Sequence, residues 1–218
     1  MELRATVKKL PFAPTVYALM RLLRGRNARF VADYSQTSGV GSDLNATKTL
    51  VSALRSCVES LSVRSILDIP CGDFVWMQNI DLGEITYIGA DIIETLIVSH
   101  QRSHASAGKT FRTLDLVTDD LPRVDLILCR DCLVHFSHRL AKKAINNIKR
   151  SNSRYLLATT FPQHSNNNDI VTGTWHPLNL CAPPFNFPAP VQLIDERHAP
   201  PYEDKSLGLW NISHLPTF

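Results

Sequence analysis

Short runs of aliphatic residues recur along the chain, and turn-forming or acidic residues close most of them. The first run, 65–69, reads Ser-Ile-Leu-Asp-Ile and is followed by Pro70. Such a run, short and rich in branched aliphatic side chains, is typical of a buried strand in a parallel sheet. Further strands are predicted over 86–90, 110–114, 124–129 and 154–160, with a final antiparallel pair over 191–194 and 206–210 at the sheet edge.

Stretches with helical periodicity separate these runs. Between 43 and 61, leucine, valine and one threonine recur at positions 44, 47, 50, 51, 54, 58 and 61, so one face of a helix would pack on the sheet. Further helices are predicted over 92–103 and 141–148, with a short one starting within 74–78. The alternation of strands and helices predicts an α/β fold with a seven-stranded, mostly parallel sheet and helices on both faces.

The composition narrows the classes of protein that fit this pattern. A chain of 218 residues suits a single α/β domain. Its formal net charge of +3 is spread over mixed signs, whereas a nucleic-acid surface would need a basic stripe with interleaved aromatic residues. No apolar run approaches the roughly 18 residues of a membrane span. Five cysteines, an odd number, in a chain without a signal-peptide pattern favour reduced thiols and a cytoplasmic location.

Residues 1–37 are expected to form a basic helical extension. Lysines and arginines surround an apolar segment at 16–23. One interpretation is an amphipathic helix that covers the edge of the domain. The other is a weak contact of residues 1–30 with a membrane surface or a partner.

Acidic residues lie where the predicted strands end, which is the edge at which open α/β sheets bind ligands. Asp68 and Asp73 flank the turn after the first strand, and Gly72 in that turn lets the backbone approach a ligand closely. Asp91 follows Asp68 by 91 − 68 = 23 residues, close to the roughly 20 expected between a nucleotide-binding turn and the acid that holds ribose hydroxyls. A carboxylate can accept both hydrogen bonds of a cis-diol, although Asp91 could also cap the next helix.

The order of these motifs resembles that of the class I S-adenosylmethionine-dependent methyltransferases, in particular small-molecule members with an Asp-x-Pro-Cys-Gly first motif. The usual first motif of the family is acid-x-Gly-x-Gly-x-Gly; here only the middle glycine is kept, as Gly72, with Pro70 and Phe74 at the outer positions. The resemblance runs from about residue 38 to 210, so a methyltransferase domain is expected over 38–218. It rests on Asp68-x-Pro70-Cys71-Gly72-Asp73-Phe74, Tyr87-Ile-Gly-Ala-Asp91, Leu114-Asp115-Leu116 and Asp125-Leu-Ile-Leu-Cys-Arg-Asp131.

The resemblance implies a Rossmann-like, seven-stranded methyltransferase fold with S-adenosylmethionine as the cofactor. It places Asp115 beside the adenine, and it makes the turn at 38–42 either a lid over the methionine end or a plain hinge. Arg130 could also anchor an anionic part of the substrate or pair with a nearby acid. The residues expected to bind the cofactor are Ser42, Asp68, Cys71, Gly72, Asp73, Asp91, Ile92, Asp115, Leu116 and Arg130.

The segment after the fourth predicted strand, 130–136, carries the candidate catalytic groups. Methyl transfer to a hydroxyl requires removal of the hydroxyl proton, and Asp131 and His135 lie near the strand end for that role. The ordinary pKa of histidine favours His135 as the base. Asp131 is either an alternative base or the group that orients the base, and His135 could instead be a packing residue. Because Cys129-x-x-Cys132 has no second ligand pair at zinc-site spacing, no metal is expected.

Residues 161–190 take the place of the helix that would normally follow the fifth strand. A loop of about thirty residues inside a compact domain is usually functional. Prolines stiffen it, and Trp175, Phe185 and Phe187 offer flat apolar faces, so we expect the wall of an acceptor site rather than a disordered segment. The residues expected to bind the acceptor are Asn168, Asp169, Trp175 and His176.

Three functions fit these patterns to different degrees. The leading one is an S-adenosylmethionine-dependent methyltransferase that O-methylates a small polar acceptor such as a sugar or glycan hydroxyl, because the loop combines aromatic faces with hydrogen-bonding side chains. A nicotinamide-dependent oxidoreductase is disfavoured because the first turn lacks Gly-x-Gly-x-x-Gly. A non-catalytic cofactor-binding module is disfavoured by the acids at 68, 91, 115 and 131.

Overall fold

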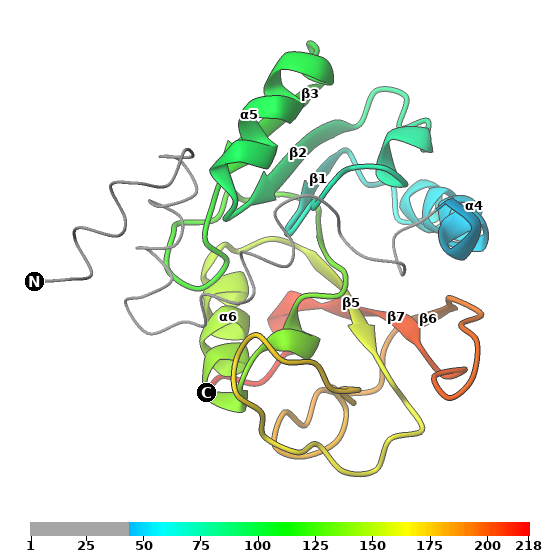
Figure 1. The fold of residues 1–218 in the computed structure, drawn as a ribbon, viewed down its shortest axis with the longest axis vertical. Coiled ribbons are helices and arrows are strands. Elements are labelled where there is room, and N and C mark those ends of the chain that lie inside the picture. Colours follow the sequence, from blue (N-terminus) through cyan, green and yellow to red (C-terminus); the bar gives the residue numbers. More distant parts are fainter. Residues whose placement is uncertain (1–43) are drawn as a thin grey trace, which may run out of the picture.

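The computed structural model describes residues 44–218, which form one seven-stranded sheet in the order β3-β2-β1-β4-β5-β7-β6 (Figure 1). The first five strands run parallel, whereas β7 is antiparallel to both of its neighbours. This arrangement confirms the predicted sheet and its antiparallel edge pair. The strands are β1 (Ser65–Asp68), β2 (Thr86–Asp91), β3 (Lys109–Thr113), β4 (Leu126–Cys129), β5 (Tyr155–Thr160), β6 (Gln192–Asp195) and β7 (Ser206–Asn211).

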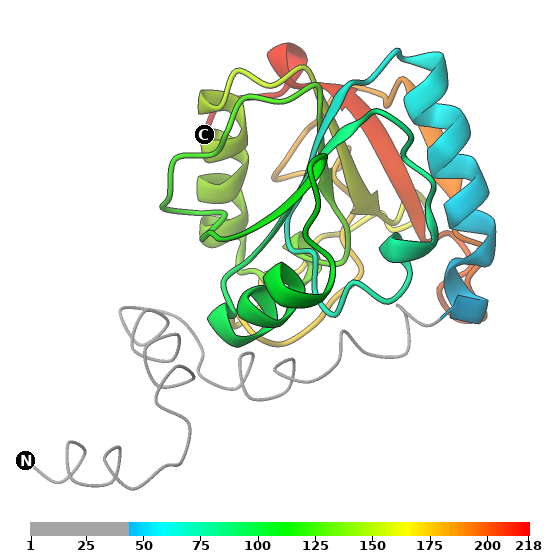
Figure 2. The same cartoon turned by 90° about the horizontal axis from the view of Figure 1, so that it is seen from above.

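Helices cover both faces of the sheet, as predicted (Figure 2). The helices α4 (Leu44–Ser60) and α5 (Glu94–Ser103) pack on one face, where Leu54 and Ile97 share a core with strand residues. The helix α6 (His138–Arg150) packs on the other face through apolar residues at helical spacing, Ala141, Ala144, Ile145 and Ile148, all fully buried. None of the helices within 44–218 combines the length and hydropathy that crossing a membrane takes.

The segments between helices and strands depart from the prediction in two places. The short helix expected at 74–78 is a 3-10 turn, η2 (Met77–Asn79). Another 3-10 turn, η3 (Leu133–His135), follows β4 and carries the candidate histidine. The predicted extension at 1–37 and the turn at 38–42, including Ser42, lie outside the described residues.

The loop at 161–190 is a part of the core as well as a surface feature. It lies beyond β5 on the same side as α6 (Figure 1), and Leu178, Leu180, Phe185 and Phe187 are buried there. The ring of Phe187 packs edge-on against that of Trp210, with centroids 5.3 Å apart. The expectation that Phe185 and Phe187 offer faces to an acceptor is therefore wrong. Because no helix follows β5, this face of the sheet needs another apolar cover, and the loop supplies it.

Candidate functional site

The acids of the first two strands meet at the carboxyl edge of the sheet. Asp68 ends β1 and Asp91 ends β2, and these strands are parallel neighbours. The turn after β1 is tied to the end of β2: the Cys71 N–H donates to the Ala90 carbonyl at 2.8 Å, and the Gly72 N–H donates to Asp91 Oδ2 at 3.2 Å. Gly72 has a φ of +55°, in the region that favours glycine. The first motif therefore places its backbone against the second acid.

Phe74 adopts a backbone conformation that is unusual for a bulky residue. Its φ is +60°, so the third glycine position of the family motif keeps a glycine-like conformation without a glycine. Such a residue costs on the order of 1–3 kcal/mol unless its surroundings fix it. Here the ring is buried against Tyr87, Phe111 and His104, with centroids between 5.1 and 5.5 Å away. Packing around the ring thus maintains the turn.

Burial perturbs both strand-end acids. It raises the pKa of Asp68 to about 7, although the Tyr87 hydroxyl donates a hydrogen bond to Asp68 Oδ2 at 2.6 Å and opposes the shift. Burial likewise raises the pKa of Asp91, against hydrogen bonds donated by the backbone N–H groups of Ile93 and Gly72. Asp91 thus serves the start of α5 and the turn after β1 at once. Carboxylates with such perturbed pKa values are enriched at functional sites.

Other predicted cofactor residues stabilise local turns. Asp115 accepts hydrogen bonds at 2.9 Å from the Val117 N–H and the Thr118 hydroxyl, so it closes the turn after β3. Leu116 is buried in the core on the α6 face. Asp73 accepts a hydrogen bond from the Val75 N–H at 3.2 Å. These contacts show how the turns are stabilised. Cofactor binding by Asp73, Asp115 and Leu116 stays a prediction.

Four charged side chains meet where β4 and β6 end and β7 begins. We call these residues, Arg130, Asp131, Glu196 and Lys205, the charged cluster. Arg130 binds Glu196 Oε2 through Nε at 3.1 Å and Nη2 at 2.6 Å. Lys205 Nζ lies 2.7 Å from Asp131 Oδ2 and 3.5 Å from Glu196 Oε2. Arg130 Nη1 lies 3.4 Å from Asp131 Oδ2, so each acid faces both cations. Of the two roles predicted for Arg130 besides cofactor binding, pairing with a nearby acid is the one observed.

Contacts within the protein determine both the backbone conformation and the ionisation state of Asp131. Its φ is +50°, and its N–H donates to the Thr159 hydroxyl at 2.8 Å. Burial raises the pKa of Asp131, but the charges of Arg130 and Lys205 and the hydrogen bond from Lys205 hold it below its ordinary value. Asp131 is therefore a carboxylate near neutral pH and a weak proton acceptor.

His135 has the opposite character. Its Nδ1 lies 2.9 Å from the Thr174 carbonyl oxygen, which can only accept, so Nδ1 carries the proton and Nε2 is the accepting nitrogen. Burial lowers the pKa of His135, although the Thr174 hydrogen bond and Asp131 oppose the shift. The imidazole is therefore neutral at physiological pH. A neutral imidazole with a fixed tautomer can act as a general base.

The predicted acceptor residues lie in different surroundings. Trp175 is 39% exposed and packs against Tyr202, with ring centroids 4.7 Å apart. Asp169 accepts a hydrogen bond from the His138 N–H at 2.7 Å at the start of α6. His176 is buried near His138, and burial lowers its pKa to about 4. Asn168 is exposed. Trp175 and His176 follow Thr174, whose carbonyl contacts His135, and the His176 N–H donates to the Val134 carbonyl at 3.1 Å.

Solved structures share this arrangement of strands and helices. The N-methyltransferase NodS from Bradyrhizobium japonicum WM9 matches with a TM-score of 0.55 and 14% identity, over 78% of this chain and 97% of that chain. An O-methyltransferase family protein from Burkholderia thailandensis matches with a TM-score of 0.52 and 16% identity, over 75% of this chain and 59% of that chain. A structure of NodS with S-adenosyl-l-homocysteine matches with a TM-score of 0.49 and 16% identity, over 68% and 74%.

The chain shares the fold of these methyltransferases. The predicted Rossmann-like methyltransferase fold is therefore confirmed. No protein-family model matches the sequence, and no curated protein resembles it closely enough to count as a match.

Several residues of the site were missed by the sequence patterns. Glu196 and Lys205 flank the connection between β6 and β7, and the Glu196 N–H donates to the Lys205 carbonyl at 3.1 Å. The sequence did offer one signal for these two residues: each is a charged residue close to the end of a strand in the predicted antiparallel pair. Asn167, rather than Asn168, organises the loop, because its side chain bonds the carbonyls of Asn179 and Pro183 at 2.8 and 2.9 Å.

Proposed function

We propose that the protein is an S-adenosylmethionine-dependent methyltransferase that methylates a hydroxyl of a small polar acceptor, such as a sugar or a glycan. The observation that carries this proposal is the pairing of Asp91 with the Gly72 turn at the carboxyl edge of the sheet. The fold shared with an N-methyltransferase and an O-methyltransferase family protein supports it.

The residues at this edge fit the cofactor. The Asp91 carboxylate accepts hydrogen bonds from the backbone of Gly72, Ile92 and Ile93, and because a carboxylate has about four lone-pair positions, it can still accept from a ribose hydroxyl. The positive φ of Gly72 brings the turn backbone close to a ligand without a side chain in the way. Asp68 and Cys71 border the same turn. When bound, S-adenosylmethionine supplies the methyl group for transfer from its sulfonium sulfur.

His135 is the better candidate for the base. As the acceptor oxygen bonds to the methyl group, its proton has to leave, and His135 Nε2 takes that proton in this proposal. Nδ1 stays hydrogen-bonded to the Thr174 carbonyl, which stabilises the imidazolium that results. Asp131 is the poorer base because Arg130 and Lys205 hold its pKa low. Its negative charge near His135 favours the protonated ring instead.

Trp175 and Tyr202 support the acceptor part of the proposal. Their rings meet at 4.7 Å on two different loops, Trp175 is 39% exposed, and the carbonyl of the residue before Trp175 contacts His135. An exposed aromatic ring can stack on the apolar face of an acceptor and turn its hydroxyl toward the base. Division of labour follows: the strand-end acids hold the cofactor, and the later loops orient the acceptor.

A binding experiment separates the proposal from its main alternative. Isothermal titration calorimetry and melting temperature, each with S-adenosylmethionine and with NAD, should show binding and stabilisation by the former only, because a ligand that binds the folded state raises its stability. Asp125→Asn, an acid at the opposite edge of the sheet, serves as the control that keeps this binding. Preferential binding of NAD would favour the oxidoreductase, and binding of neither ligand would refute the proposal.

A further inference from the structure

A polar hollow of about 440 Å³ lies next to the aromatic rings, outside the residues already assigned a role. Its walls are the segment 163–166 on one side and Pro201, Glu203 and Asp204 on the other. Asp204 joins the two walls, since Asp204 Oδ2 accepts from the Gln163 N–H at 2.8 Å and lies 3.4 Å from His164 Nδ1. The Asp204 carboxylate, whose side chain is buried, therefore holds the two walls together. The volume of the hollow falls within the roughly 300–1,000 Å³ typical of ligand pockets.

The side chains around the hollow select a class of ligand. The lining residues within 44–218 offer amide, hydroxyl, imidazole and carboxylate groups, which both donate and accept hydrogen bonds, and none of them is a lysine or arginine. An anionic ligand would lack a counter-charge and face two acids. Within residues 44–218 no group of three or more histidine, cysteine or acidic side chains is placed to hold a metal ion. A neutral ligand with several hydroxyls is the chemistry that fits such walls.

A strip of aromatic rings leads from the hollow to Trp175, which follows the residue that contacts the candidate base. His164 of the hollow packs on Phe161 at 5.7 Å, and Phe161 packs on Trp175 at 5.8 Å. Tyr202, between Pro201 and Glu203 of the hollow, packs on Trp175 at 4.7 Å. The residue before Trp175 accepts the hydrogen bond of His135. The hollow is thus joined through packed rings to Trp175, and Trp175 is joined to His135 through the backbone of Thr174.

We propose that the hollow is a sugar-binding subsite and that the acceptor is a neutral oligosaccharide rather than a single sugar. One sugar unit occupies the hollow, and its neighbour lies over Trp175 and Tyr202 with its hydroxyl toward His135. Sugar rings carry hydroxyl edges and apolar C–H faces, which match a polar pocket followed by aromatic rings. The assignment of the neighbouring unit as acceptor rests on the proposed methyltransferase function, whereas binding in the hollow does not.

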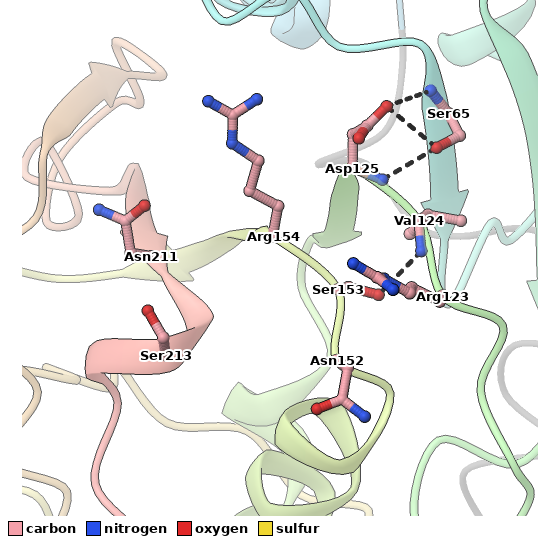
Figure 3. A pocket seen from close by; sticks show the side chains of 9 residues that line it. All are labelled: Ser65, Arg123, Val124, Asp125, Asn152, Ser153, Arg154, Asn211 and Ser213. Carbon is pink, nitrogen blue, oxygen red and sulfur yellow. Dashed lines mark hydrogen bonds between the residues drawn. The ribbon is translucent and has the colours of Figure 1, made fainter.

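The test measures saccharide binding by calorimetry and saturation-transfer NMR, with S-adenosylhomocysteine present and absent. The probes are cellobiose, maltose and N,N′-diacetylchitobiose, their monosaccharides, and charged counterparts with glucosamine or glucuronic acid. The variant is Gln163→Ala with Asn166→Ala, both exposed side chains at the hollow. The matched control is Asn211→Ala with Ser213→Ala, which removes two polar side chains from the pocket at the opposite edge of the sheet (Figure 3).

At least one neutral disaccharide should bind about tenfold more tightly than its monosaccharide. The Gln163/Asn166 variant should lose roughly two- to tenfold in disaccharide affinity for each hydrogen bond removed, while the control variant keeps the affinity of the parent protein. Equal losses in both variants, preference for the charged sugars, or no binding of any disaccharide would overturn the subsite.

The same variants separate this inference from the function on which it partly rests. If S-adenosylmethionine binds and a hydroxyl is methylated at an unchanged rate in the Gln163/Asn166 variant, the methyltransferase stands and the subsite falls. If the disaccharide binds as expected but S-adenosylmethionine does not, the subsite stands and the methyltransferase falls.

Discussion

Acids lie both at the edge where the parallel strands begin, the amino edge, and at the edge where they end, the carboxyl edge. Their surroundings differ between the two edges. At the amino edge, a pocket of about 430 Å³ includes Asp125, whose carboxylate accepts from the Arg64 N–H at 2.8 Å and from the Ser65 N–H and hydroxyl at 3.1 Å (Figure 3). At the carboxyl edge, Asp68 and Asp91 are buried with raised pKa values. Burial is the largest cause of both shifts, because it disfavours the charged form of a carboxyl group.

We infer from this difference which acids hold the fold together and which are candidates for chemistry. Asp125 fills its hydrogen bonds with the start of the neighbouring strand, so it clamps β4 to β1. Asp68 accepts a hydrogen bond from the Tyr87 hydroxyl. Asp91 accepts hydrogen bonds from N–H groups of the Gly72 turn and of the residue before α5. Acids kept at a place that disfavours their charge are candidates for function.

Replacing His135 should have the largest effect on the proposed reaction. His135→Gln removes the base, so methyl transfer should fall by about 10²- to 10⁴-fold while S-adenosylmethionine affinity stays the same. Because burial lowers the pKa of His135, the rate of the parent protein should decline only below the ordinary histidine value, near 6.5. Steady-state rates over a pH series check both expectations. A small loss of rate in the variant would return the role of base to Asp131.

The pH dependence of stability should report on Asp68. Its pKa is raised from 3.8 to about 7, so the folded state holds this proton more tightly than the unfolded state. The resulting stabilisation is complete below the ordinary pKa and is lost as the pH rises through about 7. Asp68→Asn should remove this dependence, which is on the order of 4 kcal/mol between the two limits. Urea unfolding at several pH values measures it, and Asp125→Asn should leave the slope in place.

Substitutions at Asp91 and Asp125 should have opposite effects on cofactor binding and on stability. Asp91→Ala should weaken S-adenosylmethionine binding by about 1.5–3 kcal/mol, which is roughly 10- to 150-fold, because it loses hydrogen bonds to a charged group. Asp125→Asn should lower stability without changing the affinity. Calorimetry on folded samples decides, with Asp91→Asn as a milder variant. Unchanged affinity in both Asp91 variants would remove this residue from the cofactor site.

The smallest effect is expected at Trp175. Trp175→Ala should reduce acceptor turnover by about 2- to 10-fold, from a stacking contribution of roughly 0.5–1.5 kcal/mol, with cofactor affinity and melting temperature nearly unchanged. Phe185→Ala, in the same loop but buried, should instead cost about 3–5 kcal/mol of stability. Should Trp175→Ala destabilise the protein as much and weaken both ligands, the loop would be a structural flap.

The sequence predicted the sheet well because strands buried on both faces leave a strong apolar signal. β1 and β4 appear as short aliphatic runs, and the acids at the ends of β1 and β2 follow from chain order alone. The charged cluster depends on contacts between residues more than sixty positions apart, such as Arg130 with Glu196, and local patterns carry no such information. The misjudged phenylalanines of the loop show the same limit: an aromatic ring in a polar, proline-rich segment has the same sequence signal whether it faces a ligand or the core.

The double duty of the loop at 161–190 constrains how this protein can be altered or can diverge. One segment both presents Trp175 at the surface and seals the core with Leu178, Leu180 and Phe185. Under the proposed function, acceptor preference can change through point substitutions at exposed positions of the loop, where little packing is lost. Exchange of the whole segment for another protein's loop would remove part of the core, so a folded chimaera has to carry the matching face of the sheet along with the new loop.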